Sequence, residues 1–263
     1  MKHLLSIEKI SFRDIKQILE NTVMFKRERG SQTLLPLKGQ TWAMIFAKSS
    51  TRTRVSFEVG IHELGGKALF LNTDDIQLGR GELVKDTARV LGRMTHGCII
   101  RTYAQQDVED FAHYSQIPTV NALTDQEHPC QILTDLFTME ERFGTVRSKV
   151  VAFVGDGASN ISNSWAFAAG KMDFELRVAA PVEFQLSDEV MEKAKGKIVR
   201  TTDPFEAAEG ADVLYTDTWV SMGKEEEEAR RLSLLDGYQI NRKLLEKAKK
   251  EAIVLHCLPA YRG

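Results

Sequence analysis

Three hydroxyl residues and two arginines lie together near position 50, in the run Ser50-Thr51-Arg52-Thr53-Arg54. An apolar run typical of a buried strand precedes it at 42–47, and apolar residues at helical spacing follow it at 55–64. The first turn of a helix offers unpaired backbone N–H groups and the positive end of the helix dipole. Hydroxyl and guanidinium donors at that turn match phosphate oxygens, so the run predicts a phosphate site. The alternative is a simple helix cap with two solvated arginines.

Further polar groups follow other apolar runs of the strand type. In an open parallel sheet, ligands bind beyond the carboxyl ends of the strands, so each group is a candidate site. Taken singly, each also has an ordinary structural explanation, such as a helix cap or a hydrogen-bonded histidine. The groups are Arg101, His128 to Gln131, Gly155-Asp156-Gly157 with Asn160, Asp217 to Gly223, and His256 to Pro259.

Strands and helices must alternate along the chain to position these groups. We expect strands at 41–48, 67–72, 98–100, 118–123, 150–154, 176–180, 197–200, 213–215 and 253–255. Helical spacing predicts helices at 11–29, 52–64, 84–94 and 128–144. The alternation indicates an α/β fold of two doubly wound parallel-sheet domains, with the active site in the cleft between them. A polar connector at 145–149 places the boundary between domains 1–144 and 145–263.

Composition limits the partners. The 263 residues carry a net charge of −2, so we expect no general attraction to nucleic acid or to a membrane surface. The N-terminus is charged too early for a signal peptide, and the 3 cysteines are widely spaced, which favours reduced thiols and a cytoplasmic protein. Any positive field must be local, and its candidates are Lys48, Arg52, Arg54, Arg80 and Arg101.

Together these motifs resemble those of the transcarbamoylase family, specifically its ornithine branch. The resemblance covers nearly the whole chain. Two late stretches indicate the ornithine branch, since aspartate transcarbamoylases are more basic at the second of them. The stretches that carry the resemblance are 50–54, Asp86 to Leu91, His128 to Gln131, Ser221-Met222-Gly223 and His256 to Arg262.

The resemblance implies transfer of a carbamoyl group from carbamoyl phosphate to the δ-amine of ornithine, giving citrulline and phosphate. Ser50, Thr51, Arg52 and Thr53 would hold the phosphate. Attack by the amine places negative charge on the carbonyl oxygen, for which Arg101 and His128 are the candidate donors, with Gln131 toward the carbamoyl NH₂. Gln77, in a Gly-rich and charged stretch expected to be a loop, would reach the phosphate of a neighbouring subunit. We expect no cofactor and no metal.

On the ornithine side, the resemblance implies Asp217 for the α-ammonium and Asn160 for the carboxylate. Ser221 and Met222 match a loop that closes over ornithine in the family, and Cys257 and the Leu258 carbonyl lie near the reacting amine. The amine must be neutral to react, although its ordinary pKa is about 10.4. We therefore expect burial to disfavour its charged form, and Asp217 and Cys257 to help accept its proton.

Two expectations concern assembly and the end of the chain. The resemblance implies a homotrimer or a multiple of trimers. Family members continue through a terminal helix that supplies another arginine, whereas this chain ends at Gly263. A catalytically impaired protein that only binds ligand or partners is therefore an open alternative.

Two of the motifs also allow a dinucleotide-binding enzyme or a zinc protein. The run of Val150 to Val154 into Gly155-Asp156-Gly157 resembles a dinucleotide turn, but its third glycine is missing and Asp156 would face the pyrophosphate. His128, Cys130, His256 and Cys257 could instead converge as a zinc site.

Overall fold

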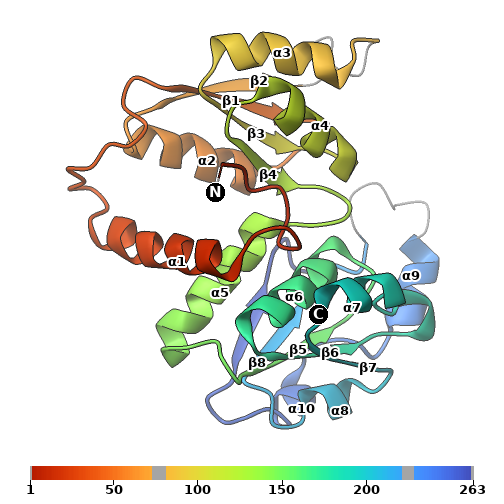
Figure 1. The fold of residues 1–263 in the computed structure, drawn as a ribbon. Helices are drawn as coiled ribbons and strands as arrows, with labels where there is room; N and C mark the ends of the chain where they lie inside the picture. The colour runs from red at the N-terminus through yellow and green to blue at the C-terminus, as the bar shows by residue number, and fades with distance from the viewer. Residues whose placement is uncertain (1, 73–80, 221–227, 262–263) are drawn as a thin grey trace. The chain divides into compact units, whose positions relative to one another are not determined.

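The computed structural model describes residues 2–72, 81–220 and 228–261 (Figure 1). The chain forms two compact units, Met1–Leu133 (unit 1) and Thr134–Gly263 (unit 2), and each unit is described by itself. The helices of the described part are each too short or too polar to cross a lipid bilayer.

Unit 1 is built on a four-stranded parallel sheet of order β2-β1-β3-β4. Its strands are β1 (Thr41–Phe46), β2 (Lys67–Asn72), β3 (Gly97–Arg101) and β4 (Thr119–Leu123). Its helices are α1 (Phe12–Arg27), α2 (Thr51–Glu63), α3 (Val84–Met94) and α4 (Gln105–Ser115), and α5 (Pro129–Phe143) begins in it. The N-terminal segment adds a short bridge to the edge strand through Leu4 and Val120.

Alternating side chains of the unit 1 strands pack against helices on opposite faces of the sheet. Ala43 and Ile45 pack with Ala88 of α3 and Phe111 of α4. Met44 and its neighbours face the other way and pack with Ile61 of α2. This alternation follows from the two-residue period of a strand, and it gives the sheet a helix layer on each face.

Unit 2 is built on a five-stranded parallel sheet of order β7-β6-β5-β8-β9. Its strands are β5 (Val150–Val154), β6 (Glu175–Ala179), β7 (Lys197–Thr201), β8 (Val213–Thr216) and β9 (Ile253–His256). Its helices are α6 (Asn160–Met172), the short η1 (Val182–Phe184), α7 (Asp188–Ala194), α8 (Pro204–Ala208), α9 (Glu228–Leu235) and α10 (Arg242–Leu245).

The unit 2 sheet is also covered on both faces. On one face, Ala152 and Leu214 pack with α8 and with Leu244 of α10. On the other, Trp165 of α6 makes an edge contact with the ring of Tyr215 at 5.2 Å between centroids. Figure 1 shows α6 and α7 on one side of this sheet and α8 and α10 on the other. The predicted class, two parallel-sheet α/β domains, is therefore confirmed.

The predicted helix at 52–64 is present as α2, and the structure adds how it packs. The spacing of Val55 and Val59 indicates a helix, and both residues lie in one, but their exposed fractions are 53% and 39%. Only Ile61 of this helix is fully buried. Hydrophobic spacing identifies a helical face but does not say what covers it.

Candidate functional site

The site in unit 1 begins at the first turn of α2. Ser50 is the N-cap, and its Oγ accepts a hydrogen bond from the Thr53 N–H at 3.2 Å and donates one to Thr53 Oγ1 at 2.8 Å. Arg101 Nη1 donates to the same Thr53 Oγ1 at 3.3 Å. Arg101 reaches this turn because β1 and β3 are paired in parallel with Phe46 opposite Arg101, so both strands end at one edge. Thr51 lies in the same first turn.

The unit 1 site is cationic and partly shielded from water. Arg101 is 8% exposed, and its pKa is lowered first by burial and then by the nearby positive charge of Arg52. The Nε of Arg101 is buried and has no hydrogen-bond partner among the described residues. A buried guanidinium with an unused donor, next to a second arginine, is costly unless an anion completes it. The arrangement is therefore suited to binding an anion.

His128 contributes a neutral ring to the same site. Burial, and then the positive charge of Arg101, lower the pKa of His128 to about 3. An imidazole that stays neutral near pH 7 can donate one hydrogen bond to a developing oxyanion without adding charge. Gln131 follows in the first turn of α5, where its N–H donates to the His128 carbonyl at 3.1 Å. The sequence-predicted residues Arg52, Thr53, Arg101 and His128 are thus linked by contacts or by charge.

Two cations of the predicted local patch are engaged away from this turn. Arg54 packs over the ring of Phe70 at 3.8 Å and pairs with Glu58 at 3.5 Å. Lys48 is buried, pairs with Asp125 and lies over the ring of Tyr103. Arg52 therefore remains the candidate arginine for the phosphate and Arg101 the candidate donor to the carbonyl oxygen, while Arg54 is engaged with Phe70 and Glu58. Arg80 lies outside the described residues.

Glu127 was not predicted as a site residue, but its hydrogen bonds hold the turn before His128. Glu127 is 3% exposed, and its Oε2 accepts a hydrogen bond from the Ile7 N–H at 2.6 Å. Its own N–H donates to Thr124 Oγ1 at 3.2 Å. A carboxylate directly before His128 is evident in the sequence. Only the fold shows that this carboxylate binds the N-terminal segment at Ile7.

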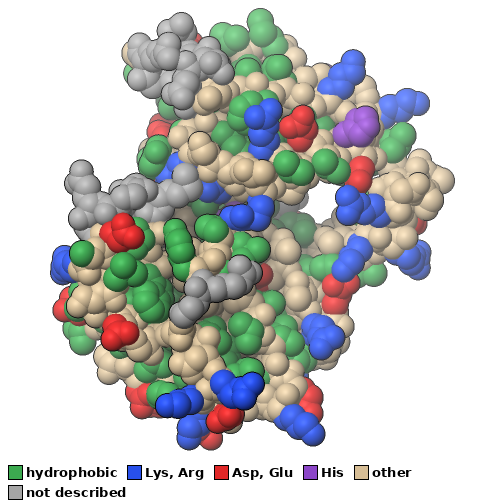
Figure 2. All heavy atoms as spheres, turned by 180° about the vertical axis from the view of Figure 1, so that it is seen from behind, with side chains coloured by type: hydrophobic (Ala, Val, Ile, Leu, Met, Phe, Trp, Pro, Cys, Tyr) green, Lys and Arg blue, Asp and Glu red, His purple; other side chains and the backbone are tan. Residues whose placement is uncertain are grey.

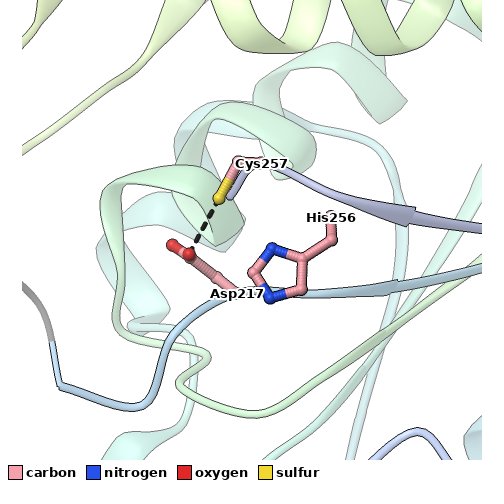
Figure 3. Close-up of side chains that lie close together, drawn as sticks. All are labelled: Asp217, His256 and Cys257. Atoms are coloured by element: carbon pink, nitrogen blue, oxygen red, sulfur yellow. Dashed lines mark hydrogen bonds between the residues drawn. The ribbon is translucent and has the colours of Figure 1, made fainter. Parts of the chain in front are cut away.

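The site in unit 2 lies at the ends of β8 and β9. These strands are adjacent and parallel, with Thr216 opposite His256, so the residues that follow each strand come together. Asp217 Oδ1 accepts hydrogen bonds from Cys257 Sγ at 2.8 Å and from the Thr218 N–H at 2.6 Å. His256 completes a group of three whose ligand atoms all lie within 4.8 Å of one another (Figure 3).

The electrostatics of this group decide which side chain carries the proton. Burial raises the pKa of Asp217, while the hydrogen bond from Cys257 opposes that rise. Burial, and then the negative charge of Asp217, raise the pKa of the Cys257 thiol strongly. Cys257 is therefore a protonated donor near pH 7, and Asp217 is the group able to accept a proton. In this arrangement Cys257 is a hydrogen-bond donor to Asp217, and the help of Cys257 in accepting the amine proton stays a prediction.

The remaining predicted residues fall into two groups. Asn160 begins α6 directly after its N-cap Ser159, and the Leu258 N–H donates to His256 Nδ1 at 2.9 Å. The peptide bond from Leu258 to Pro259 is cis. Gln77, Ser221 and Met222 lie outside the described residues.

The predicted zinc grouping is not supported by the surroundings of Cys130. Its Sγ donates to the Asn121 carbonyl at 3.4 Å, and burial raises its pKa to about 12. A zinc ligand must be a thiolate, which this environment disfavours. Within unit 2, His256 and Cys257 are grouped with Asp217.

The geometry defines an α/β protein with a cationic group at the strand ends of one sheet and a group of Asp217, His256 and Cys257 at those of the other. Residues 2–141 match the carbamoyl-P binding domain of aspartate/ornithine carbamoyltransferase. Residues 147–263 match the Asp/Orn binding domain of the same family. The chain therefore belongs to the aspartate/ornithine carbamoyltransferase family.

Relatives and solved structures agree with this assignment. An ornithine carbamoyltransferase of Akkermansia muciniphila is 55% identical over 100% of this chain and 87% of its own length. That of Methanoculleus marisnigri is 48% identical over 100% of this chain and 86% of its own. The Pyrococcus furiosus enzyme structure has a TM-score of 0.94 at 41% identity, covering 100% of this chain and 86% of that one. The structure of an anabolic ornithine carbamoyltransferase of Campylobacter jejuni has a TM-score of 0.93 at 43% identity. It covers 100% of this chain and 88% of its own.

Proposed function

We propose that this chain transfers the carbamoyl group of carbamoyl phosphate to the δ-amine of L-ornithine, giving L-citrulline and phosphate. The observation that carries the proposal is the buried Arg101. Its Nε has no hydrogen-bond partner among the described residues, its Nη1 donates to Thr53, and the positive charge of Arg52 lies nearby. The names of the relatives, all full-chain matches of 42–55% identity, support ornithine as the acceptor.

Unit 1 would bind carbamoyl phosphate. Its phosphate would accept hydrogen bonds from the hydroxyls of Ser50, Thr51 and Thr53, from backbone N–H groups of the first turn of α2, and from the Arg52 guanidinium. Arg101 and neutral His128 would donate to the carbonyl oxygen as charge develops on it, and Gln131 would orient the carbamoyl NH₂. Because phosphate is a stable leaving group, positioning and charge stabilisation would supply most of the rate.

Unit 2 would bind ornithine and receive its proton. Asp217 would hold the α-ammonium and Asn160 the α-carboxylate, while the raised pKa of Asp217 suits it to accept a proton during attack. Cys257 would keep Asp217 oriented through its S–H donor. The Leu258 carbonyl, and Gln77, Ser221 and Met222 from outside the described residues, are proposed as further substrate ligands.

The setting of the reaction follows from the same proposal. The enzyme would act in arginine biosynthesis or arginine catabolism, in the cytoplasm, as a homotrimer or a multiple of trimers. Figure 2 shows positive and negative side chains interspersed over one face of the molecule.

A product assay tests the proposal directly. The protein is incubated with carbamoyl phosphate and, in parallel, L-ornithine, putrescine or L-aspartate, and each carbamoylated product is measured. We expect citrulline from ornithine and much less product from the other two, since putrescine lacks both α-groups. Product from aspartate alone, or no product from any acceptor while carbamoyl phosphate still binds, would reject the proposed function.

A further inference from the structure

The turn Gly155-Asp156-Gly157 is not explained by binding of either substrate. Asp156 is 4% exposed, and Arg231 of α9 is 3% exposed. Arg231 Nη1 donates to Asp156 Oδ2 at 2.7 Å and to the Trp219 carbonyl at 3.2 Å. One guanidinium therefore joins the turn that follows β5 to the segment that follows β8.

Asp156 shapes the approach to Asn160. Its Oδ1 accepts a hydrogen bond from the Ala158 N–H at 3.0 Å, and its carbonyl accepts one from the Ser159 N–H at 3.2 Å. Ser159 caps α6, whose first residue is Asn160. One carboxylate oxygen thus sets the turn that presents Asn160, and the other is held by Arg231.

The segment around Asp217 is packed tightly against the same turn. Thr216 Oγ1 donates to the Val154 carbonyl at 2.6 Å. Gly155 has φ of +136°, and a Cβ there would lie 3.4 Å from Thr216 Oγ1 and 3.8 Å from the Trp219 ring. Gly157 is constrained by space instead, because a Cβ there would approach the Phe184 carbonyl to 2.8 Å. The positive φ of Gly155 and the close neighbours of Gly157 each require a glycine, so both glycines have a structural reason that involves no dinucleotide.

A buried ion pair is a poor source of stability, because the cost of removing two charges from water offsets their attraction. The pair of Asp156 and Arg231 has a further contact, since the Arg231 guanidinium lies 4.6 Å from the centre of the Phe184 ring. An exposed pair in the same unit, Arg147 with Asp173 at 2.8 Å, has no such surroundings. The buried pair is therefore better explained by the geometry that it fixes than by the stability that it adds.

We propose that Arg231, paired with Asp156, is a positioning residue that fixes the spacing between Asn160 and Asp217 and so sets recognition of the α-carboxylate and α-ammonium of the amino-acid substrate. The proposal rests on the proposed function, in which these two residues hold the two α-groups. Arg231 acts through Asp156 and the Trp219 backbone and does not itself touch substrate.

The test compares steady-state kinetics and thermal unfolding of wild type, R231M, the double variant D156N/R231M and the control R147M. R231M removes the guanidinium and leaves Asp156 buried and unpaired, so its melting temperature should fall. D156N/R231M keeps an oxygen acceptor for the Ala158 N–H and removes the unpaired charge, so its melting temperature should recover at least in part. R147M breaks the exposed pair and should leave the kinetics unchanged.

Positioning predicts that KM for ornithine rises about tenfold in both R231M and the double variant, while KM for carbamoyl phosphate stays within about twofold. Recovery of the ornithine KM together with stability in the double variant would overturn the proposal, because the pair would then be only structural. So would an equal rise in both KM values. If the wild type forms citrulline but the variants keep its KM for ornithine, only the positioning role of Arg231 is rejected. If the wild type forms no citrulline, the proposed function itself is rejected.

Discussion

Protonation of individual side chains divides the proposed chemistry between the two units. His128 has a lowered pKa of about 3 and stays neutral, whereas Asp217 has a raised pKa and can take up a proton. Arg101 keeps its charge but is buried beside Arg52. A neutral donor and a buried cation suit the developing oxyanion, and a carboxylate of raised pKa suits the departing proton of an amine.

The Cys257 thiol should control the acidic limb of the pH–rate profile. Its S–H donates to Asp217 Oδ1 and so favours the carboxylate over the protonated acid. In C257A that donor is lost, the pKa of Asp217 rises further, and a higher pH is needed to keep Asp217 ionised. The acidic limb of kcat/KM for ornithine should therefore move to higher pH.

The matched variant for this measurement is C257S, which keeps a donor at the same position and should leave the acidic limb near its wild-type pH. An acidic limb that moves to lower pH in C257A would show instead that the thiol accepts the proton.

At the scale of elements, the first turn of α2 combines a structural cap with the proposed phosphate site. The Ser50 hydroxyl caps the helix and is linked through Thr53 Oγ1 to Arg101. The sequence contains several other serine caps, among them Ser187, which accepts a hydrogen bond from the Val190 N–H at 3.2 Å at the start of α7. Comparison of the two caps separates helix stability from ligand binding.

S50A and S187A should each lower the free energy of unfolding by about 1 kcal/mol, the usual loss for a serine cap. Only S50A should also weaken carbamoyl phosphate, because only that hydroxyl lies in the proposed site. Chemical denaturation and the KM for carbamoyl phosphate measure the two effects. Equal KM values for S50A and wild type would remove Ser50 from the phosphate site.

At the scale of the whole molecule, unit 1 has hydrophobic side chains that its own core does not cover. Val55 and Val59 of α2 are 53% and 39% exposed, and Leu69 of the edge strand β2 is 43% exposed. Exposed apolar side chains four residues apart on one helix, such as Val55 and Val59, are typical of a surface that another subunit covers. They support the proposal of a homotrimer.

Sedimentation should therefore give a mass three times 29.6 kDa, or a multiple of that value. The double variant V55D/V59D should shift the protein toward smaller species, because charged side chains disfavour burial at a subunit contact. V182D, at a residue of unit 2 that is 76% exposed, is the control and should sediment as wild type. A wild-type protein that sediments as a single chain would reject the trimer.

The sequence by itself determined the order of the strands, four of the helices in the first half of the chain, and the types of residue at the strand ends. Two-residue and helical periods are local properties, and so is the hydroxyl and arginine composition of 50–54. The motifs at His128 to Gln131 and His256 to Arg262 further indicated the family, which the comparisons then confirmed.

Only the tertiary structure decided which groups are partners, because burial and long-range contacts are not encoded in spacing. It directed Arg54 to Phe70 and Glu58, buried Arg101 beside Thr53, and left Val55 and Val59 exposed. It also paired Asp156 with Arg231, residues far apart in the chain, and kept the Cys257 thiol protonated beside Asp217. Charge state and pairing depend on the surrounding low-dielectric packing, and that packing exists only once the sheets have formed.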